Sequence, residues 1–224
     1  MTLALEQSLL AEFTAATLPA RTLVWESAPA LIVSLSDKQL PRYANAANAS
    51  AADGWPVAVR SSGGTAVPVG PGILCVSVLS SFDGTPPSLA HGYEDICNPI
   101  IAALAEFGVT GTVGPAPGSF CDGKFNVLVN GQKIAGTAQR RTTRTGGGAM
   151  LSHAVVIIDG DPKKFTAVVE KFYERAGGDR RFDAEAVTSL RRFAGSQKRA
   201  SLIGDFIAAL RRASTAAPIR PDAS

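Results

Sequence analysis

A cysteine and a lysine flank a predicted β-hairpin in the stretch 118–141, which reads GSFCDGKFNVLVNGQKIAGTAQRR. Cys121 stands just before the first apolar run, and Lys133 follows the Asn130-Gly131 pair that separates the two runs. An Asn-Gly pair between apolar, β-branched runs is the strongest short-range signal for a hairpin. A candidate nucleophile and a candidate cation on one rigid hairpin form a pattern typical of an active site.

The chemistry available to this pair is nucleophilic. A thiolate attacks an acyl carbon, and a neighbouring ammonium both favours the thiolate and stabilises an oxyanion. Lys133 would do both if the fold returns its side chain to Cys121. The alternative for Cys121 is a buried structural cysteine, which the surrounding glycine-rich loop and the Asp122-Gly123 pair disfavour. Cys75 and Cys97 lie in apolar strand and helix patterns, and we expect both in the core.

A second glycine-bearing loop, RSSGGTAVPVGPGIL, begins at Arg60. Gly63 and Gly64 permit close approach of the backbone to a ligand, and their N–H groups can bind an anion or a carbonyl oxygen. Arg60 adds a planar charged donor. A plain tight turn is the alternative interpretation of this loop.

The composition is that of a globular protein, because 46% of the 224 residues are hydrophobic and 18% are charged. A net charge of +3 is too small to indicate nucleic-acid binding, and the basic cluster at 191–199 is expected to be a solvated helix face. Three widely spaced cysteines argue against a disulfide framework or a zinc site. With neither a membrane-span pattern nor a signal-peptide pattern in the sequence, we expect a cytoplasmic protein without a metal or other cofactor.

Apolar periodicity and turn residues predict six helices and seven strands. The helices are expected at 2–16, 41–53, 91–107, 162–176, 184–193 and 202–212. The strands are expected at 21–26, 30–35, 57–60, 73–79, 124–129, 133–139 and 151–158. We expect a Gly- and Pro-rich loop over 110–120, a mobile loop over 142–150 and a frayed end over 215–224.

Strands that are mostly joined by hairpins or single helices predict an α+β fold with a mixed, largely antiparallel sheet. A parallel, doubly wound sheet is the competing interpretation. The hairpin and the missing G-x-G-x-x-G after a first strand weaken it. We place a catalytic domain over 1–195 and a C-terminal helix with a frayed tail over 196–224.

The two loops together resemble the biotin/lipoate protein ligase and octanoyltransferase superfamily. RSSGGTAVPVGPGIL resembles its Arg-x-Ser-Gly-Gly-x-Ala-Val loop, and VNGQKIAGTAQRR resembles its Gly-x-Lys-Ile-x-Gly-x-Ala-Gln-Arg-Arg signature, in the same order and spacing. The N-terminal LALEQSLL, the VWE strand and the LSHAVVIID strand also fit, so the resemblance covers residues 1–193. It implies a mixed sheet flanked by helices, related to the catalytic core of class II synthetases.

The resemblance also implies a site. In this family the Gly-Gly loop wraps an acyl chain or acyl-adenylate, and the lysine of the second motif, here Lys133, holds the acyl carbonyl. The substrate-binding residues carried over to this sequence are Arg60, Ser62, Gly63, Gly64, Thr65, Ala66, Gly136, Thr137, Ala138 and Gln139. The partners of such proteins are lipoyl carrier domains, of the glycine-cleavage H type or the dehydrogenase E2 type, which are small and acidic. We expect the basic side chains of Arg140, Arg141 and Arg144 to dock one of them.

Two branches of the family differ at the loop that carries Cys121. ATP-dependent lipoate ligases usually read Arg-Asn-Asp before the first hairpin strand, and the acidic residue helps hold metal and adenylate; here these positions are Lys124, Phe125 and Asn126. Cysteine-dependent octanoyl and lipoyl transferases carry a pattern similar to Ser-Tyr-Cys-Pro-Gly, and the stretch 119–123 reads SFCDG. The resemblance therefore favours the transferase branch, with Cys121 and Lys133 as its catalytic residues.

Three hypotheses remain at this stage. In the first, Cys121 takes an octanoyl or lipoyl group as a thioester and passes it to a lysine of a lipoyl carrier domain. In the second, the chain is an ATP-dependent lipoate ligase that needs ATP and Mg. In the third, it is a non-catalytic acyl-binding member, as departures from the family pattern would allow: Val69-Gly70 replaces His-Asp, Cys75 replaces Asn, and His153-Ala154-Val155 replaces His-Gly-Thr.

Overall fold

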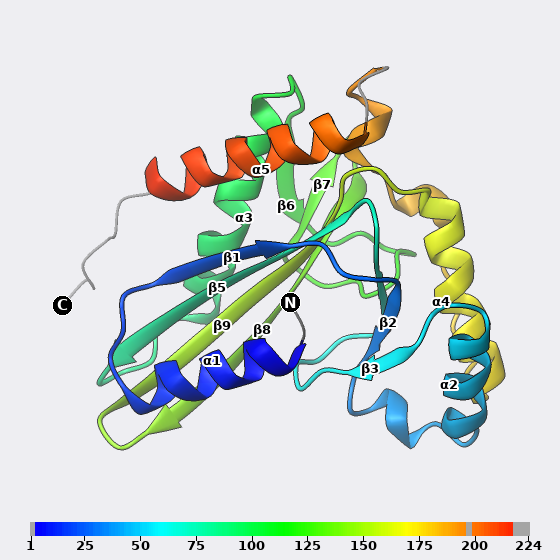
Figure 1. Cartoon of the computed structure of the whole chain (residues 1–224), viewed down its shortest axis with the longest axis horizontal. Helices are drawn as coiled ribbons and strands as arrows, with labels where there is room; N and C mark the ends of the chain where they lie inside the picture. Colours follow the sequence, from blue (N-terminus) through cyan, green and yellow to red (C-terminus); the bar gives the residue numbers. More distant parts are fainter. Residues whose placement is uncertain (1–2, 196–198, 217–224) are drawn as a thin grey trace.

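Two β-sheets make up the framework of the fold (Figure 1), and the computed structural model describes residues 3–195 and 199–216. The larger sheet has six antiparallel strands in the order β1-β5-β9-β8-β7-β6. In the smaller sheet, of order β3-β2-β4, β2 pairs parallel with β3 and antiparallel with β4. The strands are β1 (Arg21–Trp25), β2 (Ala30–Val33), β3 (Val57–Val59), β4 (Val67–Val69), β5 (Ile73–Asp83), β6 (Gly111–Gly114), β7 (Asn126–Val129), β8 (Gln132–Arg144) and β9 (Gly147–Ile157). The predicted α+β class with a mixed, largely antiparallel arrangement is confirmed.

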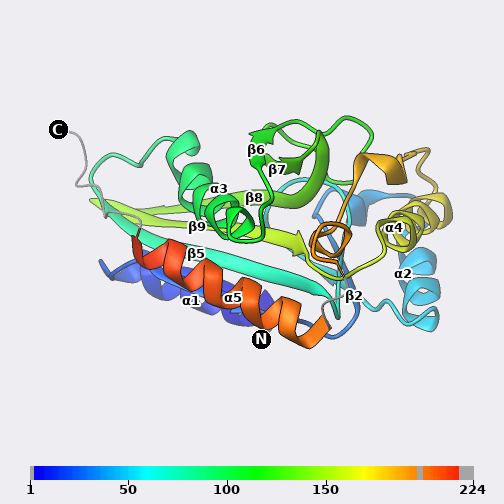
Figure 2. The same cartoon turned by 90° about the horizontal axis from the view of Figure 1, so that it is seen from above.

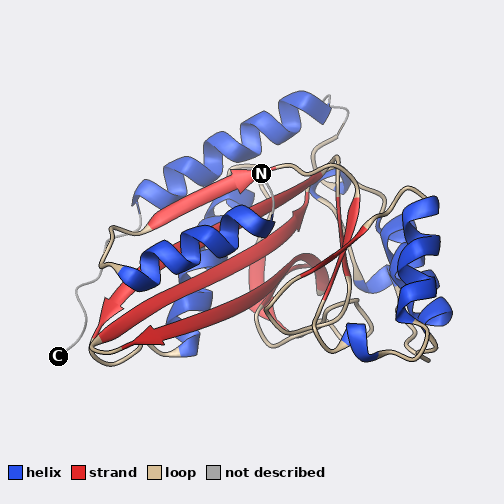
Figure 3. Cartoon of the chain, turned by 60° about the horizontal axis from the view of Figure 1, so that its bottom comes forward, coloured by secondary structure: helices blue, strands red, loops and turns tan. Residues whose placement is uncertain are grey.

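Helices cover both faces of the larger sheet. Figures 2 and 3 show α1 (Leu3–Ala15) on one face of the sheet and α3 (Leu89–Ala105) on the other. α2 (Tyr43–Ala52) and α4 (Pro162–Ala176) pack against each other beside the smaller sheet. α5 (Arg199–Ala216) packs on α3. Three short 3-10 turns complete the described elements: η1 (Asp37–Gln39), η2 (Ala184–Ala186) and η3 (Leu190–Arg192).

Local signals explain where the helix beside the smaller sheet begins and ends. The Asp161 carboxylate accepts a hydrogen bond from the Lys163 N–H at 3.0 Å, and Pro162 occupies the first helical position. Gly177 ends α4 with a left-handed φ of 85°. These bounds confirm the predicted helix at 162–176.

The C-terminal helix shares the main hydrophobic core. Leu202, Phe206 and Leu210 of α5 are buried in the same cluster as Ile96 and Ile100 of α3. The predicted boundary at residue 195, between a catalytic domain and a C-terminal helix with its tail, stays a prediction. None of the helices within the described part of the chain is long and apolar enough to cross a membrane.

Two glycine-rich stretches predicted as loops contain strand residues, although 115–120 is a loop as predicted. β6 lies within 110–120, where a Cβ on Gly111 would come within 3.1 Å of the Ile101 side chain. The stretch 142–150 is not a mobile loop, because β8 continues to Arg144 and β9 begins at Gly147. A Cβ on Gly148 would lie 2.2 Å from the Thr142 carbonyl oxygen. Close packing therefore selects glycine at these strand positions.

The predicted helix at 184–193 is also wrong. Val187 lies in an extended conformation between η2 and η3, and it forms a parallel bridge with Lys133. Arg191 lies in the short 3-10 turn η3 and pairs with Asp159 at 2.7 Å, so it does not belong to a solvated α-helix face as predicted. Thr215 belongs to α5, whereas the predicted frayed residues 217–224 and residues 196–198 lie outside the described residues.

If α5 belongs to the main core, Phe206→Ala should lower the free energy of unfolding by about 3–5 kcal/mol, because it leaves a cavity at a fully buried site. The chain should still unfold in one transition on urea titration. The exposed Leu89 serves as the control, and Leu89→Ala should change stability by about 0.5 kcal/mol or less. A loss below about 1 kcal/mol for Phe206→Ala, or two separate transitions, would contradict this packing.

Candidate active site

The predicted hairpin is present and carries the lysine into the protein interior. β7 and β8 pair antiparallel, and the turn residues Asn130 and Gly131 have φ values of 50° and 78°, as a two-residue turn with left-handed residues requires. Lys133 follows on β8 and is 2% exposed. A Cβ on Gly136 would lie 2.9 Å from the Lys133 Nζ, so the glycine leaves room for the ammonium.

The Lys133 ammonium holds the backbone of the loop that carries Cys121, called here the thiol loop. Its Nζ donates to the carbonyl oxygen of Phe120 at 2.7 Å and to that of Cys121 at 2.6 Å. Burial lowers the pKa of Lys133 to about 8, although the nearby Cys121 and Asp122 act in the opposite direction. Close to neutral pH this side chain is therefore able both to give up and to take up a proton.

Cys121 occupies a left-handed backbone position with a φ of 50°. Its N–H donates to the Thr65 hydroxyl at 2.7 Å, and its carbonyl oxygen accepts from Lys133. The side chain is 9% exposed, so the expectation that the glycine-rich loop keeps Cys121 from burial is wrong: Phe120 and Ala66 pack in the same cluster. Both backbone groups of the cysteine are held, and this fixes the direction of its side chain.

The cation placed against the sulfur atom is Arg60. Its Nη2 lies 3.5 Å from the Cys121 Sγ, so a positive charge faces the sulfur atom. The same guanidinium donates to the carbonyl oxygens of Gly63 at 3.0 Å and Thr65 at 2.7 Å, and Nη1 donates to that of Ile32 at 3.3 Å. The glycine loop therefore folds around the buried arginine and meets the cysteine loop there.

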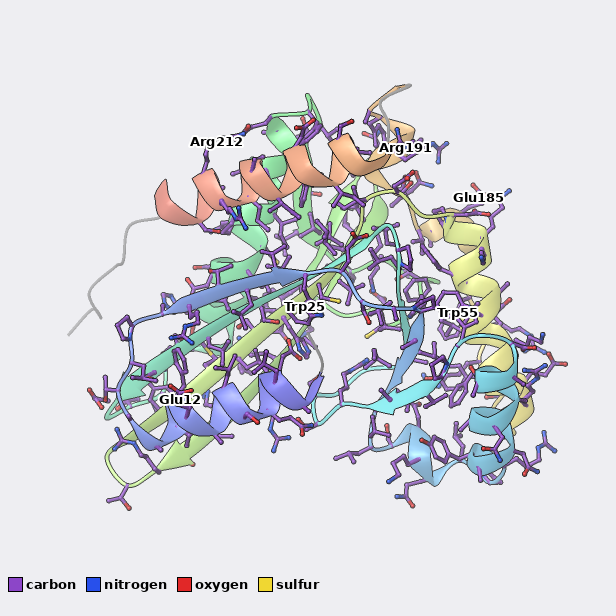
Figure 4. The ribbon with its side chains drawn as sticks, viewed as in Figure 1. Glu12, Trp25, Trp55, Glu185, Arg191 and Arg212 are labelled. Carbon is purple, nitrogen blue, oxygen red and sulfur yellow. The ribbon has the colours of Figure 1, made fainter. Side chains whose placement is uncertain are left out.

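A cavity of about 400 Å³ opens beside these residues. Apolar side chains from both sheets form most of its wall, among them Trp25 of β1 (Figure 4), Ile32, Val67, Ile73, Val155 and Ile157. Cys121, Lys133 and Arg60 line the same cavity. Its size and apolar wall are those of a small-molecule site with a few polar groups.

The structure brings some of the predicted substrate-binding residues to the cavity and places the others elsewhere. Gly136, Thr137 and Ala138 line it together with Arg60. Gln139 instead donates to the Ser152 hydroxyl at 3.1 Å and to the Leu89 carbonyl oxygen at 3.4 Å. The remaining predicted residues, Ser62, Gly63, Gly64, Thr65 and Ala66, form the glycine loop, where Ser62 lines a smaller hollow next to the cavity.

The three predicted docking arginines make contacts within the chain. Arg140 donates to the Ser61 carbonyl oxygen at 2.9 Å, and Arg141 donates to that of Pro87. Arg144 lies 3.6 Å from the Asp83 carboxylate. It also stands eleven residues beyond Lys133 on β8, a separation of about 35 Å along the strand.

A polar chain at the cavity wall was not predicted as part of the site. The His153 Nε2 lies 3.0 Å from the Ser62 hydroxyl, and its Nδ1 lies 3.8 Å from the Glu6 carboxylate, which also accepts from the Ser77 hydroxyl. Glu6 and His153 both line the cavity. Two sequence signals could have found it: both residues lie in stretches that fit the family pattern, LALEQSLL and LSHAVVIID, and Glu6 lies on the apolar face of α1, four residues before Leu10.

Asn126 shapes the thiol loop at the position where the ligases carry an acidic residue. It is 1% exposed, and its Nδ2 donates to the Asp122 carboxylate at 2.9 Å and to the Gly123 carbonyl oxygen at 2.6 Å. The Asp122 carboxylate also accepts from the Ala116 N–H at 2.7 Å. Residues 3–195 and 199–216 contain no cluster of three or more His, Cys, Asp or Glu side chains suited to a metal ion.

The two adjacent glycines of the loop provide a matched test. A Cβ on Gly64, whose φ is 104°, would lie 2.6 Å from the Cys121 Sγ and 2.9 Å from the Arg60 Nη2, whereas a Cβ on Gly63 meets no atom within 4 Å. Gly64→Ala should therefore lower the free energy of unfolding by about 1–3 kcal/mol and slow alkylation of Cys121. Gly63→Ala should change neither. Equal behaviour of the two variants in urea unfolding and in mass-mapped alkylation would contradict the described contact.

Burial of Lys133 also predicts a pH dependence of stability. Between its folded pKa of about 8 and its ordinary value of 10.5, the unfolded chain binds a proton that the folded chain does not, so raising the pH stabilises the fold. At about 1.36 kcal/mol per pH unit, wild type should gain on the order of 3 kcal/mol over Lys133→Met across this window. Urea titrations from pH 7.5 to 10.5 measure the difference. Parallel pH profiles for the two proteins would show that the fold does not lower the pKa of Lys133, and would contradict this prediction.

Known proteins resemble this chain in both sequence and structure. An octanoyl-[GcvH]:protein N-octanoyltransferase from Kyrpidia tusciae is 36% identical over 184 residues, which cover 78% of this chain and 62% of that protein. A protein of the same name from Geobacillus kaustophilus is 27% identical over 67% of this chain and 52% of its own length. The chain thus spans less than two thirds of either relative.

The fold matches a solved structure over almost its whole length. A bi-partite lipoate protein ligase from Thermoplasma acidophilum aligns with a TM-score of 0.70 and 19% identity, over 98% of this chain and 80% of that one. At this identity the likeness concerns the fold alone. The sequence matches the family described as "Lipoyl protein ligase A/B catalytic domain" over residues 1–214, and the chain therefore belongs to that family.

Proposed function

We propose that this chain is a cysteine-dependent acyltransferase of protein lipoylation. It moves an octanoyl or lipoyl group through a thioester on Cys121 to a lysine of a lipoyl carrier domain. The observation that carries the proposal is the position of Cys121 in the wall of an apolar cavity, with Arg60 against its sulfur and Lys133 against its carbonyl oxygen. A thiolate beside a cavity that holds an acyl chain is the arrangement that covalent acyl transfer requires.

In the first half of the reaction, the Cys121 Sγ attacks the acyl carbon of the donor. A C–S bond forms, the donor's C–N or C–S bond breaks, and the leaving amine or thiol takes up one proton. The oxyanion of the tetrahedral intermediate is stabilised by the Lys133 ammonium and by the loop N–H groups at Gly63 and Gly64. The Arg60 guanidinium, 3.5 Å from the sulfur, places a positive charge beside the attacking atom.

In the second half, the amine of the acceptor lysine attacks the thioester. A C–N bond forms, the C–S bond breaks, and one proton of the amine passes to the protein, which restores the thiol. Lys133 suits both proton transfers, because burial brings its pKa to about 8 and both of its protonation states are populated near neutral pH.

This route needs no ATP. When the donor is an acylated carrier lysine, an amide is broken and an amide is formed, so the transfer requires no separate activation of the acyl group. The Asn126 side chain supports this proposal over the ligase hypothesis. It stands where the resemblance implies the acidic residue that helps ligases hold metal and adenylate, and here its amide instead donates hydrogen bonds to Asp122 and Gly123.

The names of the similar proteins suggest which partner this chain would have. The Kyrpidia and Geobacillus proteins are named for transfer from octanoyl-GcvH to protein, and the Thermoplasma ligase was solved in a study of its E2 lipoyl domain. We propose that a lipoyl carrier domain of one of these types is the partner here, in the cytoplasm, where the three free thiols of the described chain would stay reduced. A docking role of Arg140, Arg141 and Arg144 stays a prediction.

Intact-protein mass spectrometry tests the proposal. The chain is incubated without ATP with an octanoylated carrier domain of the glycine-cleavage H type. We expect a hydroxylamine-sensitive octanoyl adduct on wild type, and on Cys97→Ser as the matched control, but none on Cys121→Ala. Cys97 is buried in α3 and burial raises its pKa to about 12, so it should play no part in the transfer.

Two other outcomes would overturn the proposal. Acylation of the carrier lysine only with free octanoate, ATP and Mg would make the chain a ligase. Binding of the acyl group without an adduct or transfer under either condition would make it a non-catalytic acyl-binding protein.

A further inference from the structure

The Tyr173 hydroxyl reaches from α4 to the glycine loop. Tyr173 is fully buried, and its hydroxyl oxygen accepts a hydrogen bond from the Ala66 N–H at 2.8 Å. The same hydroxyl donates to the Asp37 carboxylate at 2.8 Å. Two segments that are far apart in the sequence, η1 and α4, thereby hold one peptide of the loop beside the thiol.

The direction of this hydrogen-bond chain is fixed by its charged end. Asp37 is 4% exposed, and its second carboxylate oxygen accepts from the Ser34 N–H and hydroxyl, both at 2.9 Å. A carboxylate only accepts hydrogen bonds, so Tyr173 must donate to it. The hydroxyl oxygen is then left as the acceptor for the Ala66 N–H. Burial, supported by the Asp37 charge, raises the pKa of Tyr173, so the phenol keeps the proton that this arrangement needs.

The peptide between Thr65 and Ala66 is held from both sides. Its N–H donates to Tyr173, and its carbonyl oxygen accepts from the Arg60 Nη2 at 2.7 Å. The Thr65 side chain then accepts the N–H of Cys121 at 2.7 Å. Tyr173 therefore orients a peptide that also accepts a hydrogen bond from Arg60, the residue that faces the sulfur. The threonine of the same peptide holds the backbone of Cys121.

We propose that Tyr173, oriented by Asp37, is a positioning residue for the Cys121 thiol. It keeps the Thr65-Ala66 peptide in the orientation that aims the sulfur at Arg60. The acyl-transfer measurement rests on the proposed function. The reactivity of the thiol toward an alkylating reagent does not, because it is a property of the free protein. Tyr173 itself does not line the cavity.

The aromatic ring and the hydroxyl have separable roles. The ring packs edge-to-face against Phe172 at 5.5 Å between centroids and against Phe182 at 5.9 Å. Tyr173→Phe keeps these contacts and removes only the hydroxyl. Tyr43→Phe is the matched control, because the Tyr43 ring packs on the same Phe172 from the other helix of this layer.

A second control separates positioning from loss of stability. Val169 is fully buried on α4, one turn before Tyr173, and makes no hydrogen bond to the glycine loop through its side chain. Val169→Ala loosens the packing of α4 while it leaves the Tyr173 hydroxyl in place. The melting temperatures of all variants are measured, so that Tyr173→Phe is compared with a variant of similar stability.

The experiment is iodoacetamide alkylation at pH 7.5, resolved by peptide mass mapping of the three cysteines. We expect Tyr173→Phe to slow alkylation of Cys121 about tenfold, because a small displacement takes the sulfur away from Arg60. Tyr43→Phe and Val169→Ala should stay within about twofold of wild type. Cys75 and Cys97, both buried, report any general opening of the fold. In acyl transfer, kcat of Tyr173→Phe should fall about tenfold with little change in the KM of the donor.

The inference would be overturned if Tyr173→Phe kept the wild-type rate at Cys121, or if Val169→Ala slowed it equally. Faster alkylation of all three cysteines in Tyr173→Phe would also overturn it, because the hydroxyl would then serve stability alone. A wild-type protein that forms no acyl-enzyme would end the proposed function, and the alkylation rates would still decide the role of Tyr173.

Discussion

The site depends on the buried Lys133 ammonium, which donates hydrogen bonds to two successive backbone carbonyl oxygens. The carbonyl oxygens of Phe120 and Cys121 both face the Lys133 Nζ, at 2.7 and 2.6 Å. The cysteine takes a left-handed backbone conformation there, which is unusual for a residue other than glycine and costs about 1–3 kcal/mol when held. The rest of the site is arranged around that loop: β8 delivers the lysine, Gly136 leaves space for it, and Asn126 closes the following turn.

The second constraint is that two loops must meet at one sulfur atom. The glycine loop comes from the smaller sheet and the cysteine loop from the larger one, and Arg60 and Thr65 join them. A guanidinium fits this place better than an ammonium would, because its planar fork binds several carbonyl oxygens and still faces the thiol. The apolar cavity lies where the two sheets meet, so the cavity wall and Cys121 are positioned by the same junction.

The sequence predicted the parts of this arrangement that depend on local patterns. The Asn130-Gly131 turn, the helix from Pro162 and the motif residues near Cys121 and Lys133 were readable because turn chemistry, capping and spacing act over a few residues. The partners that hold the site were not readable, because Thr65, Tyr173 and Asp37 meet only after folding. Glycines misled the prediction at β6 and β9, where close packing of neighbouring backbone rather than flexibility selects them. Arg60 was predicted as a substrate-binding residue and it lines the cavity, but its contact with the sulfur could not be predicted from the sequence.

The central claim is that a thioester on Cys121 lies on the reaction path. The most direct measurement is a rapid-mixing experiment in which isolated octanoyl-Cys121 protein meets an unmodified lipoyl carrier domain without ATP. We expect the octanoyl group to leave the cysteine and appear on the carrier lysine at a rate equal to or faster than steady-state turnover. A thioester that persists in the presence of the carrier domain, or transfers its acyl group more slowly than the enzyme turns over, would show that acyl-Cys121 is not on the reaction path.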